Sequence, residues 1–182
     1  MATWNLDSAH TVAAFSARHM MITTVRGTLG TVTGTIEFDE ANPANSRLEA
    51  VIDATGLTSG LADRDNHLRS ADFLDVENYP TITFKSTRVE VTGDVTAKVH
   101  GDLTIRGVTR PVVIDAEYIG RTVSPFGDTR VGFTGTTKIN REDFGLTWNV
   151  AMEAGGVLVS KDIKIELDAE AILVTETEAA NA

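Results

Sequence analysis

Hydrophobic and polar residues alternate with a period of two along most of this chain, and no other feature restricts its fold as strongly. Between residues 161 and 171, apolar side chains occupy every second position from Ile163 to Ala171, with charged side chains between them. Such alternation is typical of a β-strand with one face in the core and one in water. The same pattern predicts about eight strands. They are expected at residues 12–17, 25–38, 47–54, 81–91, 95–105, 112–119, 129–139 and 161–171.

The alternation also indicates how these strands pair. Parallel sheets covered by helices read as continuous apolar runs, so alternating strands joined by short turns favour an antiparallel sheet. A sheet of this size must stack on a second sheet or close on itself, and closure removes its exposed edges. The inward positions mix large residues such as Ile36 and Phe133 with small ones such as Gly135. A packed core and a cavity for one small ligand are therefore equally compatible with the pattern.

One segment, residues 58–75, departs from the period of two. Ser59 is suited to be an N-cap, and Leu61, Arg64 and Leu68 then recur at helical spacing. We therefore expect a short helix that closes one end of a barrel. Leu61 and Leu68 should turn inward, and Arg64 and His67 should lie near the rim.

Composition and motifs exclude several classes of function. Cysteine is absent, which excludes disulfides, thiolate metal sites and cysteine nucleophiles. The 26 acidic residues outnumber the 16 basic ones, and the formal net charge of −10 disfavours binding to nucleic acid. No nucleophile elbow, nucleotide-binding loop or zinc-protease motif occurs. Asp63, Asp65 and His67 share one helical turn, but their spacing is poor for a metal, so we expect neither a metal site nor a catalytic site.

The two ends of the chain carry no targeting or membrane-spanning signal. The first residues, MATWNLDSAH, have neither a positive cluster nor an apolar run of signal-peptide length, so a cytoplasmic location is expected. The chain lacks the roughly 18 consecutive apolar residues of a membrane span, so stable membrane insertion is not expected. One domain is predicted over residues 1–174, followed by a disordered polar tail over 175–182. A homodimer is compatible with the exposed strand faces.

A series of short motifs resembles the YceI-like, polyisoprenoid-binding family. Each motif is weak, but the ordered set is specific. In order along the chain, the motifs are Asp7-Ser8-Ala9-His10 with Phe15 and His19, VRG at 25–27, RDNHLRSADFL at 64–74, YPTITF at 79–84, GDLTIRGVT at 101–109, NREDFG at 140–145 and Gly155-Gly156. The resemblance implies an all-β fold, a lipocalin-like barrel of eight antiparallel strands with a short helix closing one end. It also implies a non-catalytic protein that needs no cofactor and binds, transports or sequesters a polyisoprenoid, an isoprenoid quinone or a fatty-acyl-like lipid.

Under this interpretation, the ligand-binding residues lie on the inner wall and rim of the barrel. They are expected to be Phe15, His19, Met20, Met21, Ile22, Ile36, Arg64, Asp65, His67, Leu68, Phe73, Leu74, Ile82, Phe84, Leu103, Phe133, Gly135, Arg141, Phe144 and Trp148. The methionines are adaptable liners for a flexible apolar chain. Polar rim residues would select the head group, and the arginines among them would favour an anionic one. The alternative is a barrel enzyme or a quinone-handling redox protein in which His19 or His67 acts as acid or base.

Overall fold

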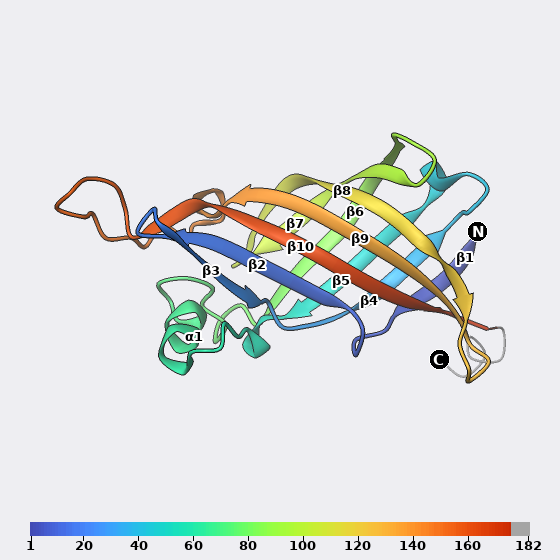
Figure 1. Ribbon diagram of the computed structural model, residues 1–182, viewed down its shortest axis with the longest axis horizontal. Helices are drawn as coiled ribbons and strands as arrows, with labels where there is room; N and C mark the ends of the chain where they lie inside the picture. The colour runs from blue at the N-terminus through green and yellow to red at the C-terminus, as the bar shows by residue number, and fades with distance from the viewer. Residues whose placement is uncertain (176–182) are drawn as a thin grey trace.

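Residues 1–175 are described by the computed structural model, and they form ten β-strands, one α-helix and three short 3₁₀ helices (Figure 1). The strands are β1 (Ala2–Leu6), β2 (Val12–His19), β3 (Thr23–Thr28), β4 (Thr31–Phe38), β5 (Arg47–Asp53), β6 (Thr81–Val91), β7 (Thr96–Ile105), β8 (Val108–Val123), β9 (Thr129–Asn140) and β10 (Val159–Leu173). The helices are α1 (Ala62–Arg69), η1 (Pro43–Asn45), η2 (Ala54–Gly56) and η3 (Arg141–Phe144). The predicted polar tail, apart from Thr175, lies outside the described residues.

Eight of the strands form a closed antiparallel ring, which confirms the predicted barrel. The ring follows the order β1-β4-β5-β6-β7-β8-β9-β10, and β10 pairs back onto β1. β10 is long enough to pair with two strands in succession, because Ala171 to Leu173 face β1 while residues 159–168 face β2. The hairpin of β2 and β3 therefore continues one wall of the barrel towards the end where α1 lies (Figure 1).

The segment that leads into α1 is hydrogen-bonded to this end of the barrel. Thr28, at the end of β3, and Thr58 exchange backbone hydrogen bonds of 2.8 and 3.0 Å. Asp65 reaches back from α1 and accepts hydrogen bonds from the backbone N–H of Ser59, at 2.7 Å, and from the hydroxyl of Thr58, at 3.0 Å. Hydrogen bonds from Ser59 hold the pKa of the Asp65 carboxyl below its ordinary value. These bonds attach the helix to the edge of the barrel.

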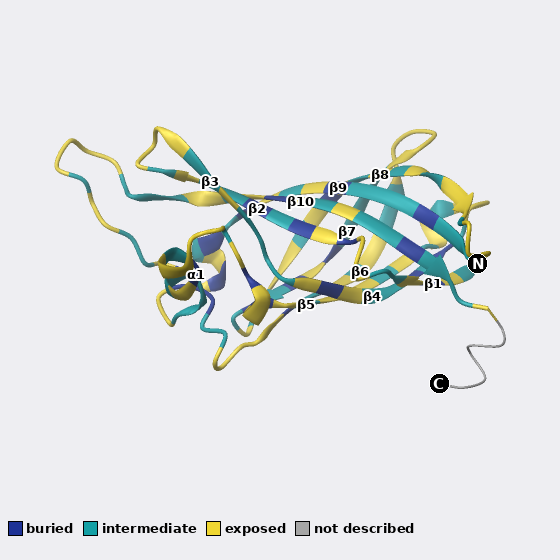
Figure 2. Ribbon diagram, turned by 60° about the horizontal axis from the view of Figure 1, so that its bottom comes forward, coloured by how far each residue is buried: buried dark blue, intermediate teal, exposed yellow. Residues whose placement is uncertain are grey.

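Burial follows the predicted alternation along the strands (Figure 2). Trp4 on β1 and Ala171 on β10 are almost fully buried at the seam that closes the ring. They pack with Ile36, Phe38 and Val131 at the end of the barrel away from α1. A second, larger cluster reaches from the middle of the barrel to α1. The apolar face of nearly every strand therefore points into the barrel.

Two local predictions need correction. The predicted strand at 25–38 is two strands, because the chain turns at Gly30, where φ is +130° and a Cβ atom would lie 1.9 Å from the carbonyl oxygen of Asp53. The helix is capped by Leu61 and not by Ser59, whose N–H and hydroxyl are bound to Asp65. Leu61 consequently faces water with 54% of its surface exposed, whereas Leu68 packs inward as predicted.

Candidate functional site

A cavity of about 740 Å³ runs through the barrel, and all ten strands contribute to its wall. This volume is typical of a small-molecule site, for which roughly 300–1,000 Å³ is usual. The residues at 97, 116 and 135 explain where part of the space comes from. Ala97, Ala116 and Gly135 are register partners on β7, β8 and β9, and all three face the cavity. Three adjacent small side chains leave a hollow strip along one wall.

Gly101, a further inward glycine, has a different role. A Cβ atom on Gly101 would lie 2.3 Å from the ring of Phe84, so this glycine accommodates a neighbouring side chain and does not line the cavity. Gly135 combines both roles, because it faces the cavity while a Cβ atom there would lie 2.9 Å from Cγ2 of Ile114. The packed core and the cavity, which the sequence left as alternatives, therefore coexist in one barrel.

The cavity extends to both ends of the barrel, which are called its two mouths below, and their lining residues carry opposite charge. At the α1 end its ionisable lining residues are Arg18, His19, Asp63, Arg64, His67 and Arg141. At the far end, where β6 turns into β7, they are Glu40, Arg47, Asp94 and Glu117. Basic groups prevail at the first mouth and acidic groups at the second. An anionic group is therefore attracted to the α1 end.

Three rings stand together at the α1 end of the cavity. His67 meets the rings of Trp148 and Phe73 edge-on, with centroids 4.6 and 5.0 Å away, and Phe73 lies 5.4 Å from Trp148. Nε2 of His67 is 2.8 Å from a carboxylate oxygen of Asp72, which fixes the imidazole ring. Edge-to-face packing of this kind stabilises aromatic clusters by more than the burial of their surface area alone. The cluster forms a firm apolar wall beside the polar rim.

Arg141 lines the cavity, but its guanidinium is engaged with the backbone. The side chain is only 3% exposed, and burial lowers the pKa of its guanidinium. The acceptors of its N–H groups are the carbonyl oxygens of Ser160 at 2.9 Å, Leu146 at 2.6 Å, Trp148 at 2.9 Å and Val159 at 3.3 Å. The predicted rim role of Arg141 is therefore secondary. This cation holds the loop after η3 against the start of β10.

The local sequence explains how Arg141 reaches this position. The side chain of Asn140 accepts a hydrogen bond from the backbone N–H of Glu142 and so caps η3. Gly145 ends η3 in the left-handed conformation, with φ at 79°. This short turn places both Arg141 and Phe144 in the interior. The NREDFG motif is thus a compact turn that carries two inward side chains.

Most of the predicted binding residues lie on the cavity wall. Those that line it are Phe15, His19, Ile36, Arg64, His67, Leu68, Phe73, Leu74, Ile82, Phe84, Leu103, Phe133, Gly135, Arg141, Phe144 and Trp148. The guanidinium of Arg64 donates two hydrogen bonds to Ser59, one to its hydroxyl oxygen at 2.7 Å and one to its carbonyl oxygen at 3.0 Å. Further lining residues were not predicted. Leu57 and Leu146 lie in loops without any periodicity, whereas others, such as Ile114 and Ile165, lie on strands whose inward faces the alternation had already indicated.

Four predicted residues lie elsewhere. Asp65 is buried against Ser59 and anchors α1 instead of facing the cavity. Met20, Met21 and Ile22 form the exposed tip of the β2–β3 hairpin, so they are not liners of the cavity. The reason is the turn itself, because Met20 and Met21 adopt positive φ angles of 51° and 62° and direct the chain out of the sheet.

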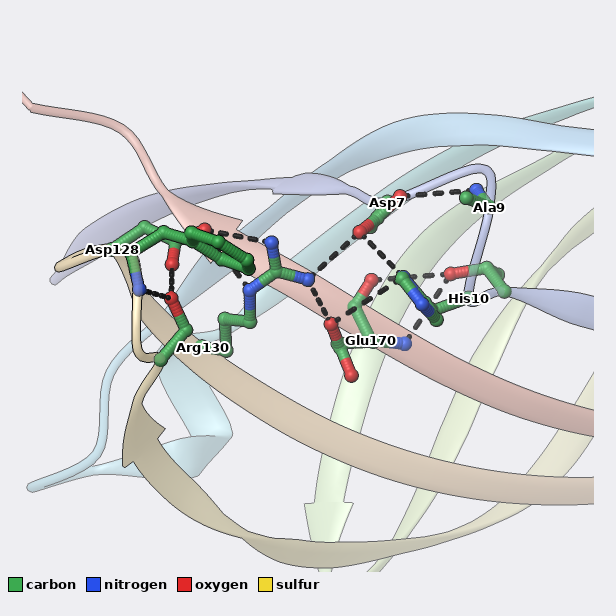
Figure 3. Close-up of polar contacts among 9 residues, drawn as sticks. Asp7, Ala9, His10, Asp128, Arg130 and Glu170 are labelled. Atoms are coloured by element: carbon green, nitrogen blue, oxygen red, sulfur yellow. Dashed lines mark hydrogen bonds and ion pairs between the residues drawn. The ribbon is translucent and has the colours of Figure 1, made fainter.

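The Asp7-Ser8-Ala9-His10 motif forms a salt-bridge network at the break between β1 and β2 (Figure 3). Arg130 on β9 forms ion pairs with Asp7, at 2.9 Å, and with Glu170 on β10. Nδ1 of His10 lies 2.8 Å from Oδ2 of Asp7, the same carboxylate oxygen that Arg130 contacts. The carboxylates of Asp7 and Glu170 and the imidazole of His10 also approach one another as metal ligands do, but the guanidinium of Arg130 already occupies both carboxylates as an ion-pair partner. The network therefore holds the N-terminal segment on the barrel.

This network predicts a pH dependence of stability. The hydrogen bond with Asp7 raises the pKa of His10 above its ordinary 6.5, and the same bond lowers the pKa of Asp7 below 3.8. The contribution of His10 should be complete below pH 6.5 and lost as pH rises through its raised pKa; that of Asp7 should be lost as pH falls through its lowered pKa. In urea titrations, the stability difference between wild type and His10→Gln should shrink as pH rises from about 6 to 9. A difference that is constant over this range would contradict the assigned role of His10.

Comparison with known proteins shows the family of this chain. The family model described as YceI-like domain matches residues 4–171. A UPF0312 protein of Vibrio parahaemolyticus is 42% identical over 138 residues, which cover 76% of this chain and 73% of that protein. The crystal structure of the Campylobacter jejuni YceI protein has a TM-score of 0.74 and 31% identity, with 87% of this chain and 90% of that chain covered.

A more distant structure shows the same fold. It is a polyisoprenoid binding domain from Saccharophagus degradans, described as implicated in plant cell wall breakdown. Its TM-score is 0.68 at 12% identity, with 96% of this chain and all of that chain covered. Within residues 1–175, no helix has the length and hydrophobicity of a membrane span.

Proposed function

Because the chain belongs to the YceI-like family, we propose that it binds one long-chain apolar lipid of the isoprenoid type inside its barrel. The observation that carries this proposal is the cavity of about 740 Å³ with an almost entirely aliphatic and aromatic wall. Its lining residues come from both ends of the barrel, and this extent suits an extended chain better than a compact ligand. The neighbour described as a polyisoprenoid binding domain supports the choice of lipid class.

Burial of an apolar chain supplies enough free energy for this function. Each methylene removed from water contributes about 0.8 kcal/mol, so a chain of ten to fifteen carbons contributes roughly 8–12 kcal/mol before ordering costs. Tight binding then needs no covalent bond and no catalytic step. We propose a carrier or sequestering protein on this basis.

The charge of the two mouths sets the direction of the bound lipid. The α1 mouth offers Arg64 and His19, whereas the far mouth offers Glu40, Asp94 and Glu117. A lipid with an anionic head group, such as a pyrophosphate, places that group at the α1 mouth. Its tail then extends along the hollow strip formed by Ala97, Ala116 and Gly135.

Native mass spectrometry tests the binding function directly. Protein purified without detergent should carry one lipid per chain, and protein stripped of lipid should take up a prenyl chain from solution. Extraction followed by lipid mass spectrometry identifies the bound class. If the purified protein carries no lipid and the stripped protein takes up neither prenyl nor fatty-acyl chains, the proposal is wrong. The acid–base alternative at His19 or His67 stays a prediction, which turnover of a bound quinone would support.

A second prediction concerns the head group. Arg64→Gln should weaken the binding of farnesyl pyrophosphate by about tenfold or more, because a charge-assisted hydrogen bond is lost. The same variant should bind farnesol nearly as well as wild type does. Both affinities are measured by fluorescence displacement. A general disturbance of the cavity would weaken farnesyl pyrophosphate and farnesol equally, so the ratio of their affinities reports on the head group alone. Equal weakening for both ligands would remove Arg64 from the head-group site.

A further inference from the structure

Exposed apolar side chains gather at the end of the molecule where α1 lies. Met20, Met21 and Ile22 form the tip of the β2–β3 hairpin, and Ile22 is 79% exposed. Val150 is exposed in the loop 149–158, which projects beside the hairpin (Figures 1 and 2). The two projections are in contact, since the N–H of Met20 donates to the carbonyl of Leu158 at 2.8 Å. Together these four side chains are called the apolar tip below.

The β2–β3 hairpin that carries most of the apolar tip is basic, unlike the chain as a whole. No acidic residue occurs between Asp7 and Glu37, although the whole chain has a formal charge of −10, and the loop 149–158 adds a single carboxylate, Glu153. Arg18 and Arg26 share one face of the hairpin, because Arg18 is paired with Thr24, two residues before Arg26. The described arginines that form ion pairs with carboxylates lie elsewhere, at Arg88, Arg121 and Arg130.

The apolar tip also borders the mouth of the cavity. His19, which directly precedes the tip, and Leu158, which is bonded to it, both line the cavity. A lipid that passes from a bilayer into this mouth would not have to expose its chain to water, at about 0.8 kcal/mol for each methylene. The position of the tip thus matches the requirement of the proposed ligand.

We propose that the apolar tip, together with Arg18 and Arg26, docks the protein reversibly on the surface of a bilayer that contains anionic lipids. Apolar side chains at the ends of two projecting loops can enter the interface between head groups and acyl chains, and each nearby arginine adds attraction to an anionic surface. The acidic residues at the far mouth, such as Glu40 and Asp94, orient the molecule with its α1 end towards the membrane. Docking is independent of the bound ligand, whereas entry of lipid at this mouth rests on the proposed function.

Vesicle flotation tests the docking surface. The probes are vesicles of phosphatidylcholine alone and vesicles with about one third phosphatidylglycerol. Wild type should float with the anionic vesicles and lose this partitioning at high salt. Arg18→Gln with Arg26→Gln should lower the partition coefficient on anionic vesicles by about 30-fold. Met21→Ser with Ile22→Ser should lower it by about tenfold or more on the same vesicles.

Phe126 supplies a matched control. This side chain is 91% exposed in the turn between β8 and β9, at the other end of the barrel, so Phe126→Ser should leave partitioning unchanged. Docking by the apolar tip is refuted if wild type binds neither kind of vesicle, or if Phe126→Ser weakens binding as much as the tip variant does. A tip variant that instead abolishes self-association in sedimentation would assign the tip to a second copy of the chain.

Loading experiments separate this proposal from the proposed function. The Met21→Ser and Ile22→Ser variant should take up prenyl lipid from ethanol solution to the same extent as wild type, because the cavity is unchanged. Its uptake from anionic vesicles should be slower by about tenfold. Vesicle binding by a protein that never takes up lipid would refute the proposed function and leave docking intact. Normal uptake of lipid by a protein that never binds vesicles would refute docking and leave the proposed function intact.

Discussion

Replacement of Arg141 by methionine is expected to lower the free energy of unfolding by about 2–4 kcal/mol. The guanidinium donates to four backbone carbonyls, from Leu146 to Ser160, in a region that excludes much water. Methionine removes all four of these hydrogen bonds, and only the carbonyl of Val159 keeps a side-chain donor, Asn149 at 2.8 Å. An unsatisfied buried acceptor costs about 1–3 kcal/mol. The variant no longer buries a positive charge, and this gain offsets part of the loss of stability. Urea unfolding monitored by tryptophan fluorescence measures the change.

Two further variants separate the hydrogen bonds of Arg141 from its charge. Arg141→Lys keeps the charge but has only three donors on one atom, so its stability should lie between wild type and Arg141→Met. Arg110→Met removes an exposed arginine that donates only to the carbonyl of Thr109, and it should change stability by less than about 0.5 kcal/mol. If Arg141→Met is no less stable than Arg110→Met, the four hydrogen bonds do not stabilise the fold.

Replacement of Ala116 by phenylalanine is expected to abolish lipid loading. Ala116 lies in the middle of the hollow strip, between Ala97 and Gly135, so a phenyl ring there projects into the cavity. Loading measured by native mass spectrometry should fall by more than tenfold, while the free energy of unfolding should change by no more than about 1–3 kcal/mol. Gly135 is a poorer choice for this test, because even a methyl group there would press on Ile114.

The outer face of the same strand provides the control for Ala116→Phe. Val113 points away from the cavity and is exposed, so Val113→Phe adds a phenyl ring without filling the interior. This variant should load lipid as wild type does. Unchanged loading by Ala116→Phe, at wild-type stability, would show that the ligand does not occupy this part of the barrel.

The fold could largely be predicted from the sequence, because the direction of each side chain follows from the period of its own strand. Ile163 and Ile165 on β10 illustrate this, since their alternation with charged neighbours already indicated which face is buried. β1 was missed, because its alternation of Ala2, Trp4 and Leu6 with two polar residues spans only five positions, too few for a clear period. Its strand conformation depends on pairing with β4 and β10, the latter more than 160 residues away in the sequence.

The candidate site was predictable where it lies on strands and less so where it lies on loops. Phe84 and Leu103 were identified by alternation, whereas the tip residues Met20 to Ile22 were misplaced because a hydrophobic run does not reveal a turn with positive φ. Leu61 was misplaced for a related reason. Its orientation depends on the bonds between Asp65 and Ser59, a tertiary detail that helical spacing does not contain.

By itself, the sequence determined the antiparallel strands, their inner and outer faces and the short helix, since all of these follow from local periodicity and steric preference. Only the tertiary structure decided that the ring closes through β1 and β10, that space remains beside Ala116, and that Arg141 turns inward. The physical reason is common to all three. The closure of the ring, the volume of the cavity and the hydrogen bonds of the buried arginine each depend on contacts between residues that are distant in the chain. A local pattern does not indicate which distant residues come into contact.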